Sequence, residues 1–468
     1  MIEFFSRKVK FQMKSFKERL GKEILFFDGA MGTQIQALGI EIPSSPEDLN
    51  VLNPEAIYSI HEKYLQAGAD IILANTFGAN KIKYRGDYSV PEVVKAGVEI
   101  ARKAILDSGK NAYVAIDIGA TGKLLEPYGE LSFTDAYNAF AELVKAGADA
   151  GADIVSIETM MDIHETKLAV LAAKENCSLP VTVTVSFNES GKTLTGASPA
   201  VVATTLDSLG VDAIGINCGL GPEQCVSMLA EMRKYTCLPI AVSPNAGLPV
   251  YVDGGTVYPL GAEEFASLMG AIYDNGASVL GGCCGTTPEH IKALTELHKG
   301  KEPISSEESE RKAYVASRSK VLPLEGTVRI GERLNTAKNP EFLDAVREED
   351  QYYIEDEAMA MEDAEADVIS IKVSGDDIDE SSAIVQVIRS AQSMSNVPFM
   401  IEADSLKALE AALRVCNGRP LVRWSEECGV SMNFARMVAK KYGALAVTQT
   451  DEEDIDGDGI VIGTLKLL

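Results

Sequence analysis

The segment Gly151-Ala-Asp-Ile-Val-Ser-Ile-Glu158 is the most informative about the fold, because it joins a glycine that can end a helix to a short apolar run. Its first four residues recur in close variants as Gly68-Ala-Asp-Ile, Gly210-Val-Asp-Ala and Gly276-Ala-Ser-Val. A repeated helix–strand unit needs a glycine that ends the helix in the left-handed conformation and leads directly into a buried strand. The recurrence therefore predicts a series of such units in residues 1–300.

Eight short apolar runs in this part of the chain suit buried strands, and a stretch of helical character follows each one. They are Ile24–Phe27, Asp70–Ala74, Ala112–Ile116, Asp153–Ile157, Val181–Val185, Ala213–Ile216, Pro239–Val242 and Ser278–Gly281. Eight units predict an α/β protein with a (β/α)8 TIM barrel. The alternative is an open doubly wound sheet. Such a sheet normally carries a glycine-rich nucleotide turn after its first strand, and Asp28-Gly-Ala-Met-Gly-Thr does not match GxGxxG.

The rest of the chain predicts a second, smaller domain. Residues 301–324 are charged and serine-rich without periodicity, which indicates a linker between residues 1–300 and residues 325–468. The strand candidates of the second domain are Thr327–Ile330, Asp367–Ile371, Pro398–Ile401, Pro420–Arg423 and Ala444–Thr448, with an edge piece at Gly459–Ile462. These are too few to close another eight-stranded barrel, so we expect an incomplete αβ domain, either a half-barrel or an open sheet.

Composition excludes several classes of function. The net charge of −26 argues against nucleic acid and against anionic membrane surfaces, since both require a basic face. No apolar run is long enough to span a bilayer, and the opening residues 1–10 lack a signal peptide's apolar segment; we expect a short helix there that covers one end of the barrel. Eight cysteines without an export signal predict reduced thiols in the cytoplasm.

Three cysteines lie where predicted strands end. Cys218 follows the sixth strand, and Cys283 and Cys284 follow the eighth. The carboxyl ends of all barrel strands meet in one basin, so these thiols can converge on one ion, and sulfur ligands select zinc or another soft metal. An isolated cysteine is more often a small buried hydrophobic residue. We assign that role to the other five, Cys177, Cys225, Cys237, Cys416 and Cys428.

A metal held by three thiolates favours thiol chemistry. The fourth position accepts a substrate thiol, which loses its proton there and stays nucleophilic at neutral pH. The expected reaction is attack of that sulfur on an activated methyl group, without a histidine base. Asp28 ends the first strand and Glu158 ends the fourth, so two carboxylates reach the same basin. Carboxylates bind an ammonium group well, and the thiol substrate is therefore expected to be an amino acid.

At these residues the sequence resembles the homocysteine S-methyltransferase family, and within it the homocysteine module of cobalamin-dependent methionine synthases. The matching phrases are Asp28-Gly-Ala-Met-Gly-Thr-Gln, Ala74-Asn-Thr-Phe-Gly-Ala-Asn, Ile157-Glu-Thr-Met, Gly215-Ile-Asn-Cys-Gly, Pro244-Asn-Ala-Gly-Leu-Pro and Gly281-Gly-Cys-Cys-Gly-Thr-Thr-Pro. The resemblance implies a zinc-bearing barrel whose metal ligands are Cys218, Cys283 and Cys284. It also implies that Asp28, Thr76 and Glu158 contact the amino acid end of homocysteine, and it places Asn245 in a substrate loop.

The second domain resembles the start of a folate-binding barrel, through Gly331-Glu-Arg-Leu-Asn335 and Pro398-Phe-Met-Ile-Glu. It departs from that pattern at Ser370-Ile-Lys-Val, Glu402-Ala-Asp and Arg423-Trp-Ser-Glu, so we expect no binding of methyltetrahydrofolate. The resemblance then predicts methionine formation with methylcobalamin on a separate corrinoid protein as donor. The second domain would serve as a platform for docking or for forming a homodimer.

Three alternatives remain open at this point. The donor could instead be methyltetrahydrofolate, or a small compound such as S-methylmethionine or a betaine. The chain could also be a zinc-containing binding or regulatory protein rather than an enzyme, with its second domain as the docking platform.

Overall fold

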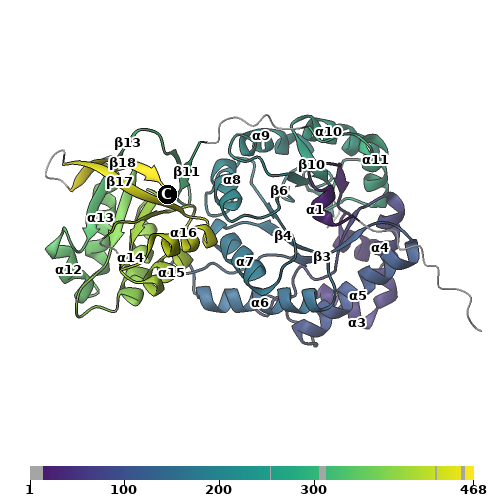
Figure 1. Ribbon diagram of the computed structural model, residues 1–468. Helices are drawn as coiled ribbons and strands as arrows, with labels where there is room; N and C mark the ends of the chain where they lie inside the picture. The colour runs from purple at the N-terminus through teal and green to yellow at the C-terminus, as the bar shows by residue number, and fades with distance from the viewer. Residues whose placement is uncertain (1–13, 253–254, 305–311, 427–428, 455–458) are drawn as a thin grey trace, which may run out of the picture.

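Eight parallel strands form the sheet of the first barrel (Figure 1). The computed structural model describes residues 14–252, 255–304, 312–426, 429–454 and 459–468, and the helix expected within residues 1–10 lies outside them. The strands are β1 (Leu25–Phe26), β2 (Ile71–Leu73), β3 (Tyr113–Ile118), β4 (Ile154–Met160), β5 (Val181–Val185), β6 (Ala213–Asn217), β7 (Ile240–Ser243) and β10 (Ala277–Leu280). Neighbours pair in sequence order, β10 pairs with β1, and a parallel bridge from Phe27 to Ile71 brings the two edges together.

Helices alternate with these strands and surround the sheet, as the repeated units predict. They are α4 (Pro54–Ala67), α5 (Val90–Ser108), α6 (Phe133–Asp149), α7 (Ile163–Asn176), α8 (Pro199–Ser208), α9 (Pro222–Met232), α10 (Ala262–Asp274) and α11 (Pro288–His298). Shorter elements are α1 (Phe16–Arg19), α2 (Met31–Ala37), the 3₁₀ helix η1 (Pro46–Asp48), α3 (Leu49–Leu52) and the hairpin strands β8 (Val250–Val252) and β9 (Gly255–Val257). The glycine of each repeated phrase has a positive φ: 108° at Gly68, 89° at Gly151, 65° at Gly210 and 90° at Gly276. The (β/α)8 prediction is confirmed.

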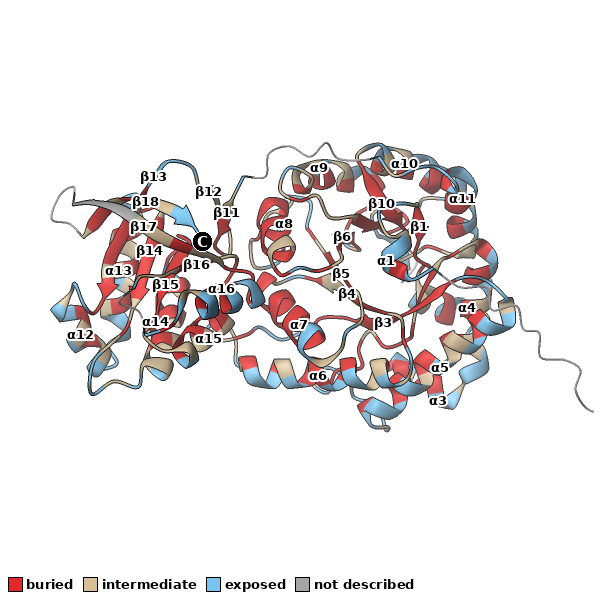
Figure 2. Ribbon diagram, viewed as in Figure 1, coloured by how far each residue is buried: buried red, intermediate tan, exposed pale blue. Residues whose placement is uncertain are grey.

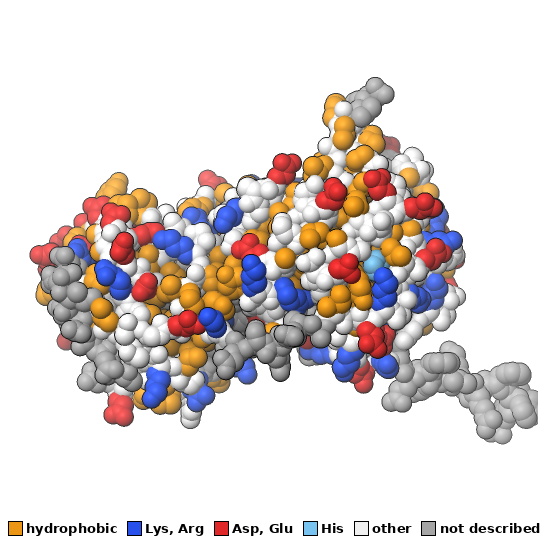
Figure 3. All heavy atoms as spheres, turned by 90° about the horizontal axis from the view of Figure 1, so that it is seen from above, with side chains coloured by type: hydrophobic (Ala, Val, Ile, Leu, Met, Phe, Trp, Pro, Cys, Tyr) orange, Lys and Arg blue, Asp and Glu red, His pale blue; other side chains and the backbone are white. Residues whose placement is uncertain are grey.

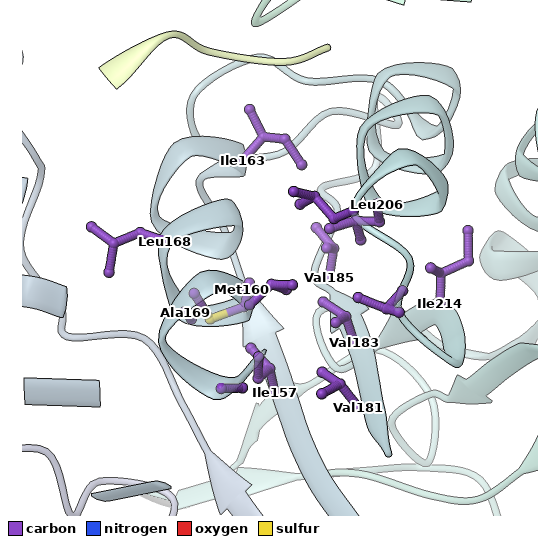
Figure 4. Packing of buried hydrophobic residues seen from close by; sticks show 14 of the residues in the cluster. Ile157, Met160, Ile163, Leu168, Ala169, Val181, Val183, Val185, Leu206 and Ile214 are labelled. Carbon is purple, nitrogen blue, oxygen red and sulfur yellow. The ribbon is translucent and has the colours of Figure 1, made fainter. Parts of the chain in front are cut away.

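Side chains of the strands alternate between two cores. The outward-facing set packs against the helices, as Figure 4 shows for Ile157 and Val183 beside Ala169 of α7 and Leu206 of α8. The inward-facing set fills the barrel axis and includes Leu25, Phe27, Ile71, Tyr113, Ala115, Ile154, Ala241 and Val279. Phe16 of α1 joins this inner core and covers its amino-terminal end. Figure 2 shows the result, with buried strands and exposed outer helix faces. The strand carboxyl ends are therefore left to form the opposite mouth.

The second sheet closes, although the sequence predicts a half-barrel or an open sheet. Its strands are β13 (Thr327–Asn335), β14 (Val368–Lys372), β15 (Phe399–Glu402), β16 (Leu421–Arg423), β17 (Leu445–Asp454) and β18 (Ile460–Leu467). The first five pair in parallel, and β18 closes the barrel by pairing antiparallel with both β17 and β13. Its helices are α12 (Pro340–Arg347), α13 (Gln351–Asp363), α14 (Glu380–Met394), α15 (Leu406–Val415) and α16 (Met432–Lys441). An antiparallel closing strand thus compensates for the small number of βα units.

The segment predicted as a linker contains an antiparallel hairpin, β11 (Tyr314–Ala316) and β12 (Val321–Pro323). Val315 lies in the inner core of the second barrel, and Ala316 pairs with Arg419 at that barrel's amino-terminal end. Strands of three residues are too short for alternation to be recognised in the sequence, which is why the hairpin was not expected.

The two barrels contact each other through α7 and α8 of the first and α14–α16 of the second (Figure 1). Lys167 of α7 is fully buried, and its ammonium donates to the carbonyl oxygens of Leu413 at 3.1 Å and Cys416 at 2.9 Å. Burial lowers the pKa of Lys167 to about 8, while the carbonyl end of α15 favours a positive charge. An ion pair of 2.9 Å joins Arg389 to Glu126 across the same interface.

Within the described part of the chain, no helix combines the length and the apolar composition that crossing a bilayer requires. On the face shown in Figure 3, acidic and basic side chains are interspersed over both barrels.

Candidate metal centre and substrate pocket

The three cysteines predicted as ligands converge at the mouth of the first barrel. Their Sγ atoms all lie within 4.8 Å of one another, and those of Cys218 and Cys284 are 3.8 Å apart. Among the residues that the structure describes, no other group of three or more Cys, His, Asp or Glu side chains has ligand atoms this close. Cys177, Cys225, Cys237 and Cys416 are free thiols outside the cluster, and Cys428 lies outside the described residues.

Backbone geometry holds the thiols in place. Cys218 has a left-handed φ of 57°, and its N–H donates to the Ser243 carbonyl at 3.1 Å, one residue beyond the end of β6. Cys283 donates its N–H to the Pro244 carbonyl at 2.8 Å, and the Cys284 carbonyl accepts from Ala246 at 3.0 Å. The loop after β7 therefore connects the ends of β6 and β10 and brings the three cysteines together.

The sulfur spacing fits one tetrahedral ion. A zinc–sulfur bond of about 2.3 Å in tetrahedral geometry places two ligand sulfurs about 3.8 Å apart, which is the distance between Cys218 and Cys284. Each of the three residues is partly exposed, so a fourth ligand has access. The donor set and its spacing therefore suit zinc with one open position.

The thiols strongly affect one another's ionisation. Hydrogen bonds with Cys218 and Cys283 lower the pKa of the Cys284 thiol to about 3. Hydrogen bonds with Cys218 and Cys284 raise the pKa of Cys283 well above its ordinary value. One thiolate is thus stabilised by two neighbouring thiols, as expected of a cluster that receives a cation.

Carboxylates lie beside the thiols. Asp28 is 2% exposed; its Oδ2 accepts from the Leu73 N–H at 3.0 Å, whereas its Oδ1 has no partner. Burial, and then the charge of Glu158, raise the pKa of Asp28 well above its ordinary value. Burial, and then the charge of Cys284, raise the pKa of Glu158 to about 7. Asp28 is therefore near enough to Glu158, and Glu158 near enough to Cys284, for their charges to interact.

Thr76 and Asn245 lie at the same mouth and differ in whether their side chains are already hydrogen-bonded. Thr76 is fully buried, and its hydroxyl donates to the Asp117 carbonyl at 2.8 Å and accepts from the Asp117 N–H at 3.0 Å. That hydroxyl is therefore already engaged with β3. Asn245 donates its backbone N–H to the Leu220 carbonyl at 2.9 Å, and its buried Oδ1 has no partner. Asn245 keeps a free acceptor for a ligand.

The sequence reasoning missed three residues of this site. Asp117, a buried carboxylate, directly follows the run predicted for the third strand, so extending that run by one residue would have identified it. Asn217 precedes Cys218; its amide accepts from the Thr159 N–H at 2.8 Å and donates to the Thr159 hydroxyl at 2.7 Å.

Tyr258 is the third, and nothing in the sequence indicated it. Burial, and then the charge of Cys284, raise the pKa of Tyr258, and its ring lies over Gly285, where an added Cβ would come within 2.3 Å of the Tyr258 Cγ. Gly285, with a φ of 80°, is therefore required beside the ligands.

At the mouth of the second barrel, in contrast to the first, acidic and basic side chains are paired with one another. Its last inward-facing positions are occupied by Glu332 of β13, Lys372 of β14, Glu402 of β15, Arg423 of β16 and Gln449 of β17. Arg423 donates to Glu402 at 2.6 Å, to Glu332 at 2.7 Å and to Gln449 at 3.0 Å. Lys372 pairs with Glu402 at 2.7 Å and with Asp404 at 3.2 Å, and Lys338 pairs with Glu332. The charges of this layer neutralise one another.

Comparison with known proteins agrees with this geometry. A family model described as homocysteine S-methyltransferase matches residues 25–298. Proteins named methionine synthase from Mycobacterium tuberculosis and Mycobacterium leprae are 30% and 29% identical to the chain. Each alignment covers 93% of this chain, but only 38% and 39% of the relatives, so the chain spans less than two-fifths of their length. The oxidized form of the homocysteine methyltransferase MmuM from Escherichia coli superposes with a TM-score of 0.51 and 26% identity, covering 58% of this chain and 95% of that one.

Proposed function

Because this chain belongs to the homocysteine S-methyltransferase family, we propose that it is a zinc-dependent methyltransferase that converts homocysteine to methionine. The observation that carries the proposal is the group of three cysteine sulfurs, spaced for one tetrahedral ion and placed beside buried carboxylates. A metal site alone would be compatible with a structural role. The partly exposed thiols and the adjacent unpaired carboxylate oxygens favour a site for an amino acid thiol.

In this proposal Cys218, Cys283 and Cys284 hold the zinc. When bound, the ion supplies a fourth position at which a substrate thiol loses its proton to solvent. The homocysteine sulfur then forms a bond to the methyl carbon as the bond between that carbon and the donor breaks. Asp28 and Glu158 orient the substrate through its ammonium group. Asn245, with its free Oδ1, is proposed as a further polar contact, and Thr76 as a residue that shapes the pocket wall.

The proposed donor is methylcobalamin carried by a separate corrinoid protein. The loops that follow the first barrel's strands carry exposed apolar side chains, which suit a large partner: Leu124, Met161, Leu194, Val250, Tyr251 and Val257. The second barrel is a poor candidate for holding methyltetrahydrofolate, because its inward polar groups are already paired with one another. S-methylmethionine and betaine-type donors are the alternatives that the assay must separate.

Two further predictions accompany the proposal. A cluster of three thiolates needs a reducing compartment, so we infer a cytoplasmic location. The second domain, residues 325–468, is proposed as a platform for docking or for forming a homodimer, which sedimentation of the metal-loaded protein would detect.

The test combines metal content with methyl transfer. Purified protein is expected to contain one zinc per chain and to form methionine from homocysteine and methylcobalamin, in preference to methyltetrahydrofolate, S-methylmethionine or betaine. Cys218→Ser, Cys283→Ser and Cys284→Ser should each lose most of the metal and nearly all activity, because the thiolate is the ligand. Cys237→Ser is the matched control, since Cys237 is a partly exposed thiol outside the cluster.

Two outcomes would contradict the proposal. Stoichiometric zinc retained in any of the three ligand variants would refute the metal assignment. Absence of methionine with every donor, together with an X-ray absorption edge that homocysteine leaves unchanged, would favour a structural zinc in a binding protein.

A further inference from the structure

Asp117 occupies the last inward-facing position of β3. Tyr113 and Ala115 belong to the inner core of the barrel, and strand alternation places Asp117 on the same inner face, one layer nearer the mouth. On the neighbouring strand the inward set runs from Ile154 to Glu158. Asp117 pairs in register with Ser156, so it lies on the inner face, two residues before Glu158 in the register of the two strands.

The surroundings of Asp117 fix its backbone but leave its carboxylate without a partner. The Thr76 hydroxyl binds both its N–H and its carbonyl group, at 3.0 and 2.8 Å. The side chain is 7% exposed, and its Oδ1 has no hydrogen-bond partner. Buried carboxylates are normally paired, so this oxygen needs an explanation.

The groups that face Asp117 are mostly acidic. Burial, followed by the charges of Glu158, Asp28 and Glu47, raises its pKa well above the ordinary value. Lys83 is the cation with an effect on it, but the Lys83 ammonium lies over the Phe77 ring at 4.3 Å. Among the described residues, no ion pair reaches Asp28, Asp117 or Glu158. The carboxylates at the mouth thus lack a paired cation.

The second barrel shows what a mouth layer without a ligand looks like. There, Glu332 and Glu402 share Arg423 and are each paired with a lysine. In the first barrel, the charges of Glu158 and Asp28 raise the pKa of Asp117, and the buried Oδ1 atoms of Asp28 and Asp117 are unpaired. The unpaired oxygens are available to accept hydrogen bonds from a cationic group.

We propose that Asp117 is a third carboxylate of the substrate pocket and selects thiols that carry an α-ammonium group. An ammonium has three N–H donors and suits unpaired carboxylate oxygens such as the Oδ1 atoms of Asp28 and Asp117. The inference rests on the proposed function, because the pocket lies beside the thiols that would hold the reacting sulfur. Thr76 acts through Asp117 by holding the backbone that carries the carboxylate.

Two consequences follow for the protein itself. Homocysteine should bind much more tightly than 4-sulfanylbutanoate, which has the same carbon chain, thiol and carboxylate but no ammonium. Asp117→Asn should lose most of this discrimination, because the amide removes one negative charge and offers competing N–H donors. The same substitution should raise the melting temperature of the substrate-free protein, since it relieves repulsion among buried carboxylates.

The experiment is calorimetric binding to the zinc-loaded full chain without any methyl donor. Wild-type protein should discriminate homocysteine from 4-sulfanylbutanoate, and Asp117→Asn should lower that ratio at least tenfold by weakening homocysteine alone. Asp149→Asn, on the exposed end of α6, is the matched control and should leave the ratio unchanged. Zinc content and melting temperature of both variants are measured in parallel.

The outcomes separate the two hypotheses. If wild-type protein discriminates and Asp117→Asn keeps the ratio, Asp117 does not contact the ammonium and only this inference fails. If wild-type protein binds neither compound, the proposed function fails together with it. If Asp117→Asn does not fold, the predicted gain in stability is wrong, and the carboxylate is structural.

Discussion

Replacing Arg423 with methionine tests whether the ion pairs at the mouth of the second barrel stabilise it. The Arg423 side chain is 11% exposed and lies between Glu332, 3% exposed, and Glu402, 11% exposed. Methionine keeps a long apolar side chain in the barrel but removes the hydrogen bonds to both carboxylates and to Gln449.

The expected loss in the free energy of unfolding depends on which ion pairs Glu332 and Glu402 keep after the substitution. Removing one partner of a buried ion pair costs about 3–5 kcal/mol, because a buried charge is left uncompensated. Glu332 keeps Lys338 and Glu402 keeps Lys372, so we expect a loss near the lower end, about 3 kcal/mol in the free energy of unfolding.

The loss of stability in Arg423→Met should also depend on pH. In the wild-type protein burial raises the pKa of Glu402, but the charges of Arg423 and Lys372 outweigh burial and hold it below its ordinary value. Stability from this group is therefore present above the unfolded-state pKa and is lost as the pH falls. Without Arg423 the pKa of Glu402 rises, and protonation then relieves the unpaired charge. The destabilisation should be larger at about pH 8 than at about pH 5.

The assay is urea unfolding followed by the fluorescence of Trp424, the single tryptophan of the chain, which lies in the second barrel. Circular dichroism reports on both barrels in the same samples. The control is Lys312→Met, which breaks an exposed pair with Glu325 at 2.8 Å and should leave the stability close to that of the wild-type protein, because solvent screens exposed pairs. A stability of Arg423→Met within about 1 kcal/mol of wild type at both pH values would refute the reasoning.

Two further predictions concern the first barrel. Because the pKa of Glu158 is about 7, homocysteine affinity should increase as the pH rises through that value and the carboxylate gains its charge. Glu158→Gln should weaken binding by roughly 1–3 kcal/mol at about pH 8 and flatten this part of the profile, and calorimetry showing the wild-type profile in the variant would make Glu158 structural. Asn217→Ala removes both bonds that hold Thr159 at its φ of 56° and should lower the free energy of unfolding by roughly 1–3 kcal/mol. Adding Thr159→Gly should restore part of that loss, because glycine adopts this conformation without strain; a fully stable Asn217→Ala would contradict the assignment.

The fold of the first barrel was predictable because its signals are local. Each strand run lies next to the glycine that ends the preceding helix, and all eight runs correspond to observed strands. In the second barrel every strand candidate is also observed, but closure was not predictable. It depends on β18 pairing antiparallel with β13, a contact between segments far apart in the chain that no local pattern encodes.

The candidate site, like the fold, was predictable only in part. Residue type and position at a strand end were enough to single out Cys218, Cys283 and Cys284, and the barrel topology brings them together. The family resemblance implied a substrate contact for Thr76, but it did not indicate that the Thr76 hydroxyl is hydrogen-bonded to the backbone of Asp117. Hydrogen-bond partners across strands depend on register, which single-strand patterns do not reveal.

Periodicity, residue type and order along the chain were therefore enough to predict the barrel, the three thiols and the chemistry that three thiolates permit. Which charges are balanced became evident only from the three-dimensional contacts. Glu402 is neutralised by Arg423 and Lys372, while Asp28 and Asp117 in the first barrel keep unpaired oxygens. The physical reason is that the free energy of a buried carboxylate is set by the groups within a few ångströms of it, and those groups come from different strands.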